Sequence, residues 1–455
     1  MGVSTGRGPT RSAPGARAKV ETKIETKVRR PLPRREVVER EPAIAPLPPR
    51  QRRAFSTVGG AVETGGDPAD AAILGKLWKV DPGLARALTH GFHSYAGRMH
   101  PSIARGAIAA WSQPGDVVVD PFCGSGTVLV EAMGAGRVAI GVDASPLGVA
   151  IAQTRTTLLD EAARAELVAE ANRIAEESGD NARKRRRPEI PAWGDAEFQR
   201  FFPHVAFELF GLRALVMEAR PRKAVAHALR MSFSSNLVKL MKAGPEAPRD
   251  GADKRIARGV PSRLLSDRAA ELASSLAVLA RRTPPGTPAP AIHLGDARDL
   301  KFIKTGSVQL IVSSPPYAGT YDYAAQHDVR FAWMEFPRRA FERTQVGARA
   351  GAGTGRGGFG ADPGAWSQAQ DQWMAEMARI LCPGGRAMLV VGDGVVGDRA
   401  EDAADSIADT ADRAGLLPVA RASQERATHD RRLREIFAGR PRREHLLLLR
   451  KPSRR

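Results

Sequence analysis

The chain has 455 residues and is 42% hydrophobic, so it can bury a large core, either as one domain with an insertion or as two domains. A formal net charge of +19 predicts attraction to polyanions such as nucleic acids, and about half of this excess lies before residue 60. Two cysteines exclude a disulfide framework and a cysteine zinc site. With no apolar run of membrane-spanning length and no secretory signal core, the composition favours a cytoplasmic protein.

Residues 1–58 mix Pro, Arg, Lys and Glu with almost no periodic apolar pattern, which predicts a disordered basic tail. Two apolar runs, 117–119 and 138–142, each end at an aspartate and predict buried strands. A glycine-rich turn and a helix over 127–135 separate them, and a second helix is expected from Ser145 to about Thr157. This order predicts parallel strands joined by a right-handed crossover.

Residues of about 160–284 predict helices only, interrupted by the charge run 183–187 and a loop at 243–253. The remaining elements are expected, in chain order, as strands at 291–294 and 308–312, a Gly/Arg-rich stretch at 347–360, a helix at about 366–381, a strand at 387–391, a helix near 402–414 and a final strand at 445–449. The pattern predicts an α/β fold with a helical insertion.

A glycine-rich segment between the first predicted strand and helix is the first candidate site, because glycine lets a backbone approach a ligand closely. It reads Asp120-Pro121-Phe122-Cys123-Gly124-Ser125-Gly126-Thr127. Asp143 ends the next strand, where a carboxylate can accept hydrogen bonds from ribose hydroxyls. Since the third glycine of the dinucleotide fingerprint is missing, NAD or FAD fits only in part, and a structural turn is an alternative.

The second candidate site follows the strand at 308–312 and reads Ser313-Ser314-Pro315-Pro316-Tyr317. Two prolines at a strand exit hold the backbone in a rigid extended turn. An aromatic base amine is a poor nucleophile, because its lone pair is delocalised into the ring, so it needs an acceptor aimed at its N–H. The Ser314 oxygen and the Pro315 carbonyl can supply that acceptor, and Tyr317 offers a flat face to a base that has left its stack.

Both segments resemble motifs of the amino-methyltransferases that act on nucleic-acid bases: the glycine-rich segment resembles motif I, and the Ser-Pro-Pro-Tyr tetrapeptide resembles motif IV in its cytosine N4 form. The resemblance implies a Rossmann-like methyltransferase sheet of about seven strands, the last one antiparallel, with S-adenosylmethionine as cofactor and no metal. It implies cofactor-binding roles for Tyr95, Asp120, Pro121, Phe122, Gly124, Ser125, Gly126, Thr127, Asp143, Ala144, Asp296 and Ala297, and catalytic roles for Ser314, Pro315, Pro316 and Tyr317. Within these sets, Asp296 would face the adenine amino group, and Tyr95 would cover the methionine end or simply pack as an aromatic.

The activity implied is methyl transfer to an exocyclic amino group in DNA, with cytosine N4 favoured and a restriction endonuclease as a candidate partner. Adenine N6 in DNA, guanine N2 in RNA and a catalytically silent nucleic-acid-binding protein remain alternatives. The cofactor loop precedes the tetrapeptide, an order shared by a subgroup of bacterial DNA methylases and by RNA guanine-N2 enzymes. Ser314 and Ala318 differ from the Asp/Asn-Pro-Pro-Tyr-Gly of the RNA enzymes, which favours DNA over RNA. Cytosine C5 chemistry is excluded, because neither cysteine follows a proline as its nucleophile usually does.

The implied domains are the tail (1–58), the two parts of a methyltransferase domain (59–160 and 285–455) and a helical insert (161–284) that could recognise the target. Arginines of the run 183–187, with Arg349 and Arg356, could read guanine edges, although arginine contacts phosphate more often. The polar residues 232–236 lie on an otherwise apolar helix, and either a base contact or a packing role would explain them. The sequence indicates no oligomeric state.

Overall fold

The computed structural model describes residues 60–243, 255–348, 360–428 and 431–453. The predicted disordered tail and the arginines at 349 and 356 lie outside these ranges. Among the described residues, no helix combines the length and apolarity needed to cross a bilayer.

Strands form mainly where short apolar runs are bounded by turn residues. The strands are β1 (Val62–Gly66), β2 (Val117–Asp120), β3 (Val138–Asp143), β4 (Ala291–Leu294), β5 (Val308–Ser313), β6 (Leu381–Gly392), β7 (Gly394–Val396), β8 (Arg399–Glu401), β9 (Leu417–Glu425) and β10 (Arg443–Arg450).

Several helices begin where a serine or aspartate side chain caps the first turn and a proline occupies the first helical position, as Ser145 does before α4 and Asp362 before α13. The helices are α1 (Pro68–Leu77), the 3-10 helix η2 (Pro82–Ala85), α2 (Pro101–Trp111), α3 (Thr127–Gly134), α4 (Pro146–Thr156), α5 (Glu161–Arg183), α6 (Gly194–Phe198), α7 (Pro203–Glu218), α8 (Lys223–Leu240), α9 (Val260–Arg282), α10 (Tyr323–Gln326), α11 (Asp328–Trp333), α12 (Arg338–Thr344), α13 (Pro363–Ile380), α14 (Ala403–Arg413) and α15 (Arg431–Ile436).

In the described part of the chain, eight strands form one sheet in the order β1-β9-β10-β6-β5-β2-β3-β4. The strands β2 to β6 run parallel to one another, β10 is antiparallel to β6, and β9 and β1 follow with alternating direction. The chain moves outward from β2 first through β3 and β4 and then, on the other side, through β5 and β6. The strand order therefore reverses between β2 and β5, and ligands bind beyond the carboxyl ends of the strands at such a switch point.

Helices cover both faces of the sheet. Because successive residues of a strand point to opposite faces, each central strand packs against both helical layers. In β10, Leu446 and Leu448 join the buried cluster of α1, α2 and α3, whereas Leu447 and Leu449 join the cluster of α13 and α14. Each fully buried leucine contributes about 1.5–3 kcal/mol to folding. The result is the predicted Rossmann-like sheet between two helical layers.

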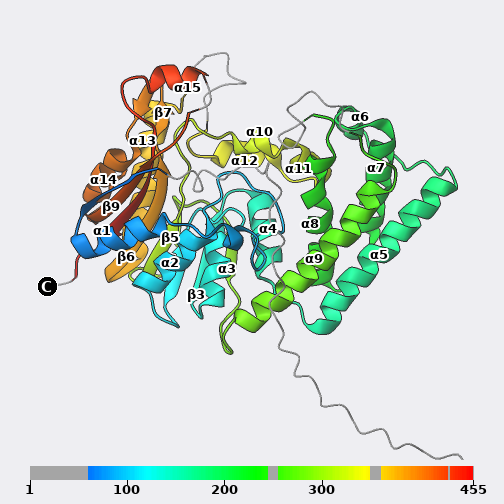
Figure 1. Ribbon diagram of the computed structural model, residues 1–455, viewed down its shortest axis with the longest axis horizontal. Helices are drawn as coiled ribbons and strands as arrows, with labels where there is room; N and C mark the ends of the chain where they lie inside the picture. Colours follow the sequence, from blue (N-terminus) through cyan, green and yellow to red (C-terminus); the bar gives the residue numbers. More distant parts are fainter. Residues whose placement is uncertain (1–59, 244–254, 349–359, 429–430, 454–455) are drawn as a thin grey trace, which may run out of the picture. The chain divides into compact units, whose positions relative to one another are not determined.

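The helical insertion lies in sequence between α4 and β4, and Figure 1 shows α5, α7, α8 and α9 side by side. Contacts link α5 with α9 and α8 with both α9 and α4, so the insertion packs on a helix of the sheet domain. Its core also receives Trp333 from α11, which is fully buried and stacks on Phe210 at a centroid distance of 4.5 Å. The segment that follows the predicted catalytic corner is thereby anchored on the insertion.

The sheet is larger than the seven strands expected. The extra edge strand, β1, was not predicted, and neither was β9, to which it pairs antiparallel. The predicted strands and helices between residues 117 and 157 and beyond 291 are present, with bounds that differ by up to six residues; the largest difference is at β6, which begins at Leu381 and not at 387.

Candidate active site

The cofactor loop, residues 120–127, leaves the end of β2 and turns into α3. Gly124 and Gly126 have φ values of 46° and 79°, a region that side-chain-bearing residues rarely adopt. Space is limiting as well, because a Cβ at Gly126 would lie 2.8 Å from the Cβ of Ala152, and one at Gly124 would lie 3.1 Å from the ring of Tyr95. Glycine is therefore needed at both positions.

Asp143 at the end of β3 fixes the shape of this loop. Its Oδ2 accepts a hydrogen bond from the backbone N–H of Gly124 at 2.7 Å, and its Oδ1 accepts one from the backbone N–H of Ser145 at 2.8 Å. A carboxylate has about four lone-pair positions, so acceptor capacity remains on both oxygens.

Asp120 lies beside it at the end of β2 and is buried. Its Oδ1 accepts hydrogen bonds from the hydroxyl of Ser313, at 2.7 Å, and from the backbone N–H of Phe122. Burial raises the pKa of Asp120 to about 7 and that of Asp143 to about 6, and their mutual repulsion adds to the rise at Asp120. Two acidic groups thus share the bottom of one cleft and would be stabilised as anions by a cationic ligand.

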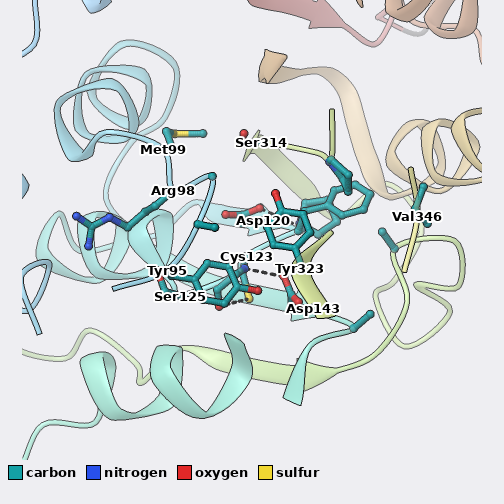
Figure 2. A pocket seen from close by; sticks show the side chains of 18 of the residues that line it. Tyr95, Arg98, Met99, Asp120, Cys123, Ser125, Asp143, Ser314, Tyr323 and Val346 are labelled. Carbon is teal, nitrogen blue, oxygen red and sulfur yellow. Dashed lines mark hydrogen bonds between the residues drawn. The ribbon is translucent and has the colours of Figure 1, made fainter. Parts of the chain in front are cut away.

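One cleft brings the two candidate sites together (Figure 2). The predicted residues that line it are Tyr95, Asp120, Pro121, Phe122, Gly124, Ser125, Thr127, Asp143, Ala144, Asp296, Ala297, Ser314 and Pro316. Gly126 and Pro315 are not among its lining residues, and Tyr317 lines a neighbouring pocket instead. The glycine loop and the double-proline corner therefore face a common space.

Two observations bear on whether this lining suits S-adenosylmethionine, a cationic nucleoside with polar ends. The hydroxyl of Thr127 is buried without a hydrogen-bond partner among the described residues, so a polar ligand group would satisfy it. The raised pKa values of Asp120 and Asp143 would be relieved by a positive charge. The residues present fit the cofactor.

Tyr95 and Asp296 border the cleft in different ways. The Tyr95 ring covers Gly124 and stacks on His327 at a centroid distance of 4.7 Å. Tyr95 therefore packs as an aromatic residue and also lines the cleft. Asp296 is held by a 2.6 Å ion pair with Arg298 in the loop after β4. Whether it meets an adenine amine stays a prediction.

A second pocket opens beside the first and shares with it Ser314 and residues 95–99. Tyr317, Tyr321 and Glu444 line this pocket, and Ser314 alone of the tetrapeptide borders both spaces. Tyr317 donates a hydrogen bond from its hydroxyl to Oε1 of Glu444 at 2.6 Å. Three aromatic or acidic side chains therefore meet where a flat base could enter.

Sequence reasoning missed an array of buried ions behind the cofactor loop. Arg155 of α4, which is fully buried, donates to the backbone carbonyl of Ser125 and, at 3.0 Å, to the Ser125 hydroxyl. Arginine only donates, so the His90 Nδ1 that Arg155 contacts is an acceptor and Nε2 donates to Glu131, at 2.8 Å. Hydrogen bonds from His90 and Arg105 outweigh burial and lower the pKa of Glu131 to about 2, whereas burial lowers that of His90 to about 3. The array holds Ser125 in place.

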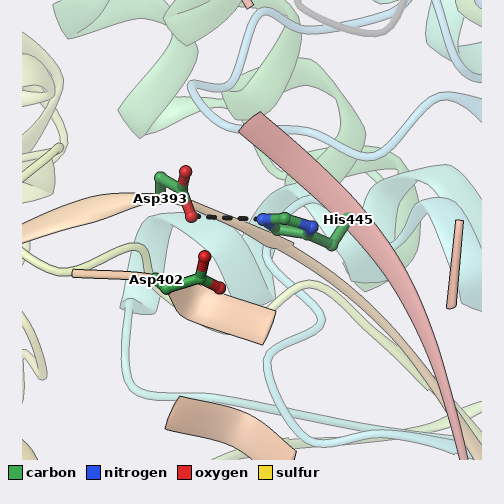
Figure 3. A group of neighbouring side chains, drawn as sticks. All are labelled: Asp393, Asp402 and His445. Carbon is green, nitrogen blue, oxygen red and sulfur yellow. Dashed lines mark hydrogen bonds and ion pairs between the residues drawn. The ribbon is translucent and has the colours of Figure 1, made fainter. Parts of the chain in front are cut away.

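Asp393, Asp402 and His445 form a group with metal-ligand chemistry next to β6 (Figure 3). Arg440 Nη1 lies 3.0 Å from Asp393 and 3.1 Å from Asp402, so a cation already occupies the space between the carboxylates. Asp393 also accepts from His445 at 3.1 Å and from two backbone N–H groups. The carboxylates of Asp393 and Asp402 therefore already have partners within the protein, and we assign the group a structural role.

The two residue groups that the sequence offered for target recognition, 183–187 and 232–236, differ in their exposure to solvent. The run 183–187 at the end of α5 is exposed throughout, with Arg187 over the ring of Phe207 at 5.5 Å. The residues 232–236 are buried inside α8, where Ser232 donates to the Ala228 carbonyl and Asn236 to that of Leu264. The structure therefore favours packing over base contact for this second group.

The strand order and the glycine loop at the switch point define a Rossmann-like α/β protein with a methyltransferase sheet and a helical insertion. Residues 73–154 match a family model described as DNA methylase. M.MjaII of Methanocaldococcus jannaschii, a type II methyltransferase, is 38% identical over 71 residues, which are 16% of this chain and 13% of that protein. M.MvaI of Kocuria varians, also a type II methyltransferase, is 35% identical over 78 residues, 16% of this chain and 17% of that protein.

These matches are confined to the region around the cofactor loop, which is similar to that of DNA methylases, and they support S-adenosylmethionine as the cofactor. They span less than a fifth of the length of either relative. Among solved structures, a DNA modification methylase from Thermus thermophilus is 20% identical over 35% of this chain and 53% of that chain, with a TM-score of 0.19. An S-adenosylmethionine-dependent methyltransferase from Methanosarcina mazei is 9% identical over 76% of this chain and 97% of that chain, with a TM-score of 0.31.

Proposed function

We propose that this protein transfers a methyl group from S-adenosylmethionine to an exocyclic amino group of a base in DNA, with cytosine N4 as the favoured target. The observation that carries the proposal is the position of Ser314, which borders both the cleft lined by the cofactor loop and the pocket lined by Tyr317. An acceptor at that junction can meet an amine on one side and a methyl donor on the other.

On the cofactor side, Gly124 and Gly126 let the backbone approach the ligand, and Asp143 has lone pairs left for ribose hydroxyls. Asp120 lines the same cleft, and in its ionised form it would supply negative charge to a cationic ligand. When bound, S-adenosylmethionine supplies an electrophilic methyl group on a positively charged sulfur.

On the base side, the oxygen of Ser314 and the carbonyl of Pro315 would accept the N–H bonds of the target amine, which stabilises the charge that develops on nitrogen. Tyr317 and Tyr321 would hold the base after it leaves the helix stack. The serine at the first position of the tetrapeptide favours cytosine N4 over adenine N6. The amine can lose its proton to solvent after transfer.

DNA as the substrate is supported by the methylase match of residues 73–154 and by the basic balance of the chain. The exposed run 183–187 on the helical insert is a candidate contact with phosphates or base edges. A restriction endonuclease as partner is part of the same proposal and rests on the resemblance of the two motifs alone.

Transfer of a tritiated methyl group to DNA and to tRNA, assayed side by side, tests the proposal. We expect label in DNA, and mass spectrometry of the nucleosides should identify N4-methylcytosine. Label in tRNA alone would replace DNA by RNA, and N6-methyladenine would correct the base. If S-adenosylmethionine gave no thermal stabilisation at saturation, the catalytically silent binder would be the better description.

A further inference from the structure

His327 follows the double-proline corner in sequence and lines the same pocket as Tyr317. The residue is buried, with 2% of its surface exposed. Its ring stacks on that of Tyr95, and further rings continue from there at centroid distances of 6.2, 5.4 and 6.3 Å, in the order Tyr95, Tyr323, Tyr321, Tyr317. A row of aromatic rings therefore connects His327 with the tetrapeptide.

The contacts of the His327 ring fix which of its nitrogens carries the proton. Arg330 Nη1 lies 3.2 Å from Nδ1 of His327, and a guanidinium can only donate, so Nδ1 is the acceptor. Burial, together with the charge of Arg330, lowers the pKa of His327 to about 3, so the ring is neutral at physiological pH. A neutral imidazole that accepts at Nδ1 has its one proton on Nε2. His327 is therefore an N–H donor at Nε2.

This donor lacks an acceptor within the protein. Nε2 of His327 is buried, and no group among the described residues forms a hydrogen bond with it. His93, which is equally buried, shows the usual arrangement: its Nδ1 contacts the carbonyl of Ser94 at 2.8 Å and its Nε2 the hydroxyl of Ser234 at 3.2 Å. Buried polar groups are nearly always hydrogen-bonded, so the Nε2–H of His327 needs a partner from outside the chain.

His100 presents a second donor of this kind to the same pocket. Its Nδ1 accepts from the backbone N–H of Ser102 at 3.2 Å, and burial lowers its pKa to about 4, so its proton is also on Nε2. That Nε2 again has no partner among the described residues. A ligand that carries acceptor atoms therefore suits this pocket. Of the two histidines, His327 stands in the row of rings that a flat base would contact.

The bases differ in what lies beside their exocyclic amine. Cytosine has two acceptors there, N3 and then O2, and adenine has the acceptor N1. Guanine has the donor N1–H beside its N2 amine, which would oppose another N–H group. Proteins that extrude a base recognise it by hydrogen bonds to its Watson–Crick edge and by contacts with its faces. An N–H donor near an aromatic wall is suited to both tasks.

We propose that His327 is a specificity-determining residue, which donates a hydrogen bond from Nε2 to N3 or O2 of the extruded cytosine. The assignment rests on the proposed methyltransferase function and adds a second polar contact to it. Ser314 would accept from the amine, while His327 would donate to the neighbouring acceptor edge. Together they match the order of donor and acceptors on cytosine, and they disfavour guanine.

Two substitutions separate hydrogen bonding from packing at this position. His327→Phe keeps an aromatic ring against Tyr95 and removes the donor, whereas His327→Gln loses the ring and keeps an N–H donor on its amide. We expect His327→Phe to lower kcat/KM for DNA about tenfold or more, and His327→Gln to retain more activity than His327→Phe. The reverse order would show that the ring only packs, and would overturn the assignment.

The matched control is His227→Gln. His227 is half-buried on α8, donates to the carbonyl of Ala150 at 2.9 Å and lines neither pocket of the site, so kcat/KM should stay at the wild-type value. The melting temperature of each variant, and its thermal shift with S-adenosylmethionine, should also match the wild type. These two measurements distinguish a lost contact with the base from a damaged fold.

Base analogues test the same bond from the DNA side, without any substitution in the protein. In a duplex that the wild-type protein methylates at cytosine, the target is replaced by 3-deazacytosine, which lacks the N3 acceptor, or by 2-thiocytosine, whose sulfur is a weak acceptor. One of the two should lower kcat/KM about tenfold. The same analogue should cause little further loss in His327→Phe, because the bond is already absent there.

The outcomes distinguish this inference from the function on which it rests. Wild-type rates with both analogues, or losses that multiply when the analogue is combined with His327→Phe, would overturn the assignment of His327 and leave the methyltransferase function in place. A wild-type protein that methylates no nucleic acid would overturn the proposed function, and this inference with it.

Discussion

The two neighbouring pockets of the site differ in whether their buried acidic groups have a cationic partner. We call the cleft lined by the cofactor loop the cofactor half and the pocket lined by Tyr317 the base half. On the cofactor half, Asp120 and Asp143 are surrounded by neutral donors, and within the described residues neither makes an ion pair. On the base half, Glu444 is paired with Arg426 at 2.9 Å. Among the described residues, the two carboxyl groups of the first half therefore have no cationic side chain at ion-pair distance, whereas the carboxylate of Glu444 in the second half has one.

This difference indicates what each half is suited to bind. A cationic ligand stabilises the ionised carboxylates of the cofactor half and is favoured there by charge alone. A neutral, flat ligand that enters the base half would meet a Glu444 carboxylate that is already paired with Arg426. One cleft can thus sort a sulfonium donor and a neutral base into separate positions, and each of the following changes should affect one half only.

The largest effect is expected from Ser314→Ala. Removing the acceptor at the junction of the two halves should lower kcat by about a hundredfold or more, as loss of one transition-state hydrogen bond does in other enzymes. The thermal shift with S-adenosylmethionine should not change, because Ser314 makes no bond to the cofactor loop in the contacts described here. Equal losses of turnover and cofactor affinity would contradict the separation of the halves.

Asp143→Asn should act on the cofactor half. The amide keeps one acceptor but places an NH₂ group against one of the two backbone N–H groups that Asp143 binds, at Gly124 or Ser145. Affinity for S-adenosylmethionine, measured by calorimetry, should fall about ten- to a hundredfold, in line with roughly 1.5–3 kcal/mol for a hydrogen bond to a charged group.

The matched control for this change is Asp362→Asn. Asp362 caps α13 by accepting from the backbone N–H of Ala365 at 2.9 Å, and asparagine is an equally good cap. Cofactor affinity should stay at the wild-type value. DNA binding should survive in both variants, and its loss in Asp143→Asn would show that the halves are not independent.

The pH dependence of cofactor binding sharpens the same comparison. Because a cation favours the ionised carboxylates, affinity for S-adenosylmethionine should rise from pH 5 to pH 8, through the raised pKa values of about 6 for Asp143 and about 7 for Asp120. Without ligand the sign is opposite: a carboxyl whose pKa is raised on folding contributes stability below about pH 4, which is lost as the pH rises through 6 and 7.

Thermal melts from pH 5 to pH 8, with and without S-adenosylmethionine, measure both trends. In the free protein, the contribution of these two carboxyl groups to the melting temperature should decrease as the pH rises. The additional stabilisation by S-adenosylmethionine should increase over the same range, and it should correspond to an affinity about tenfold higher or more at pH 8 than at pH 5. Asp143→Asn should flatten the second trend. An affinity that falls with rising pH would refute the charge argument.

The smallest effect is expected from Arg155→Lys. Lysine keeps the positive charge but loses the planar fork that contacts Ser125 and His90 together. Cofactor affinity should weaken several-fold, about the effect of one hydrogen bond of roughly 1 kcal/mol, and methyl transfer at saturating cofactor should be unchanged. A rate defect at saturation would mean that the array supports the base half too.

Much of the sheet was predictable because its central strands are short apolar runs between turn residues, as at 117–119 and 308–312. The strand β9 was missed, since its sequence interrupts apolar residues with Pro418, Arg421 and Gln424, and its outer positions face solvent. The edge strand β1 contains a single apolar residue, Val62, and pairs through its backbone. Such strands form because a neighbouring strand is present, which local sequence does not record.

The residues of the candidate site also differ in how far the sequence alone could identify them. The glycine loop and the tetrapeptide are contiguous in sequence and could be identified as units. Arg426 and Glu444 could not, because their contact with the Tyr317 hydroxyl depends on the pairing of β9 with β10. Arg155 did leave a signal: it is the one charged residue of α4, an otherwise mostly apolar helix.

The pairing of β1 with β9 joins residues 62–66 to residues 420–424, almost the full length of the chain apart. During synthesis on the ribosome, the N-terminal strand must wait for nearly all of the protein to emerge before its partner exists. Contacts of such separation slow folding, and until they form, the outer edge of the sheet is open to association with other chains. Fusions or truncations near residue 60 should therefore affect the yield of folded protein before they affect catalysis.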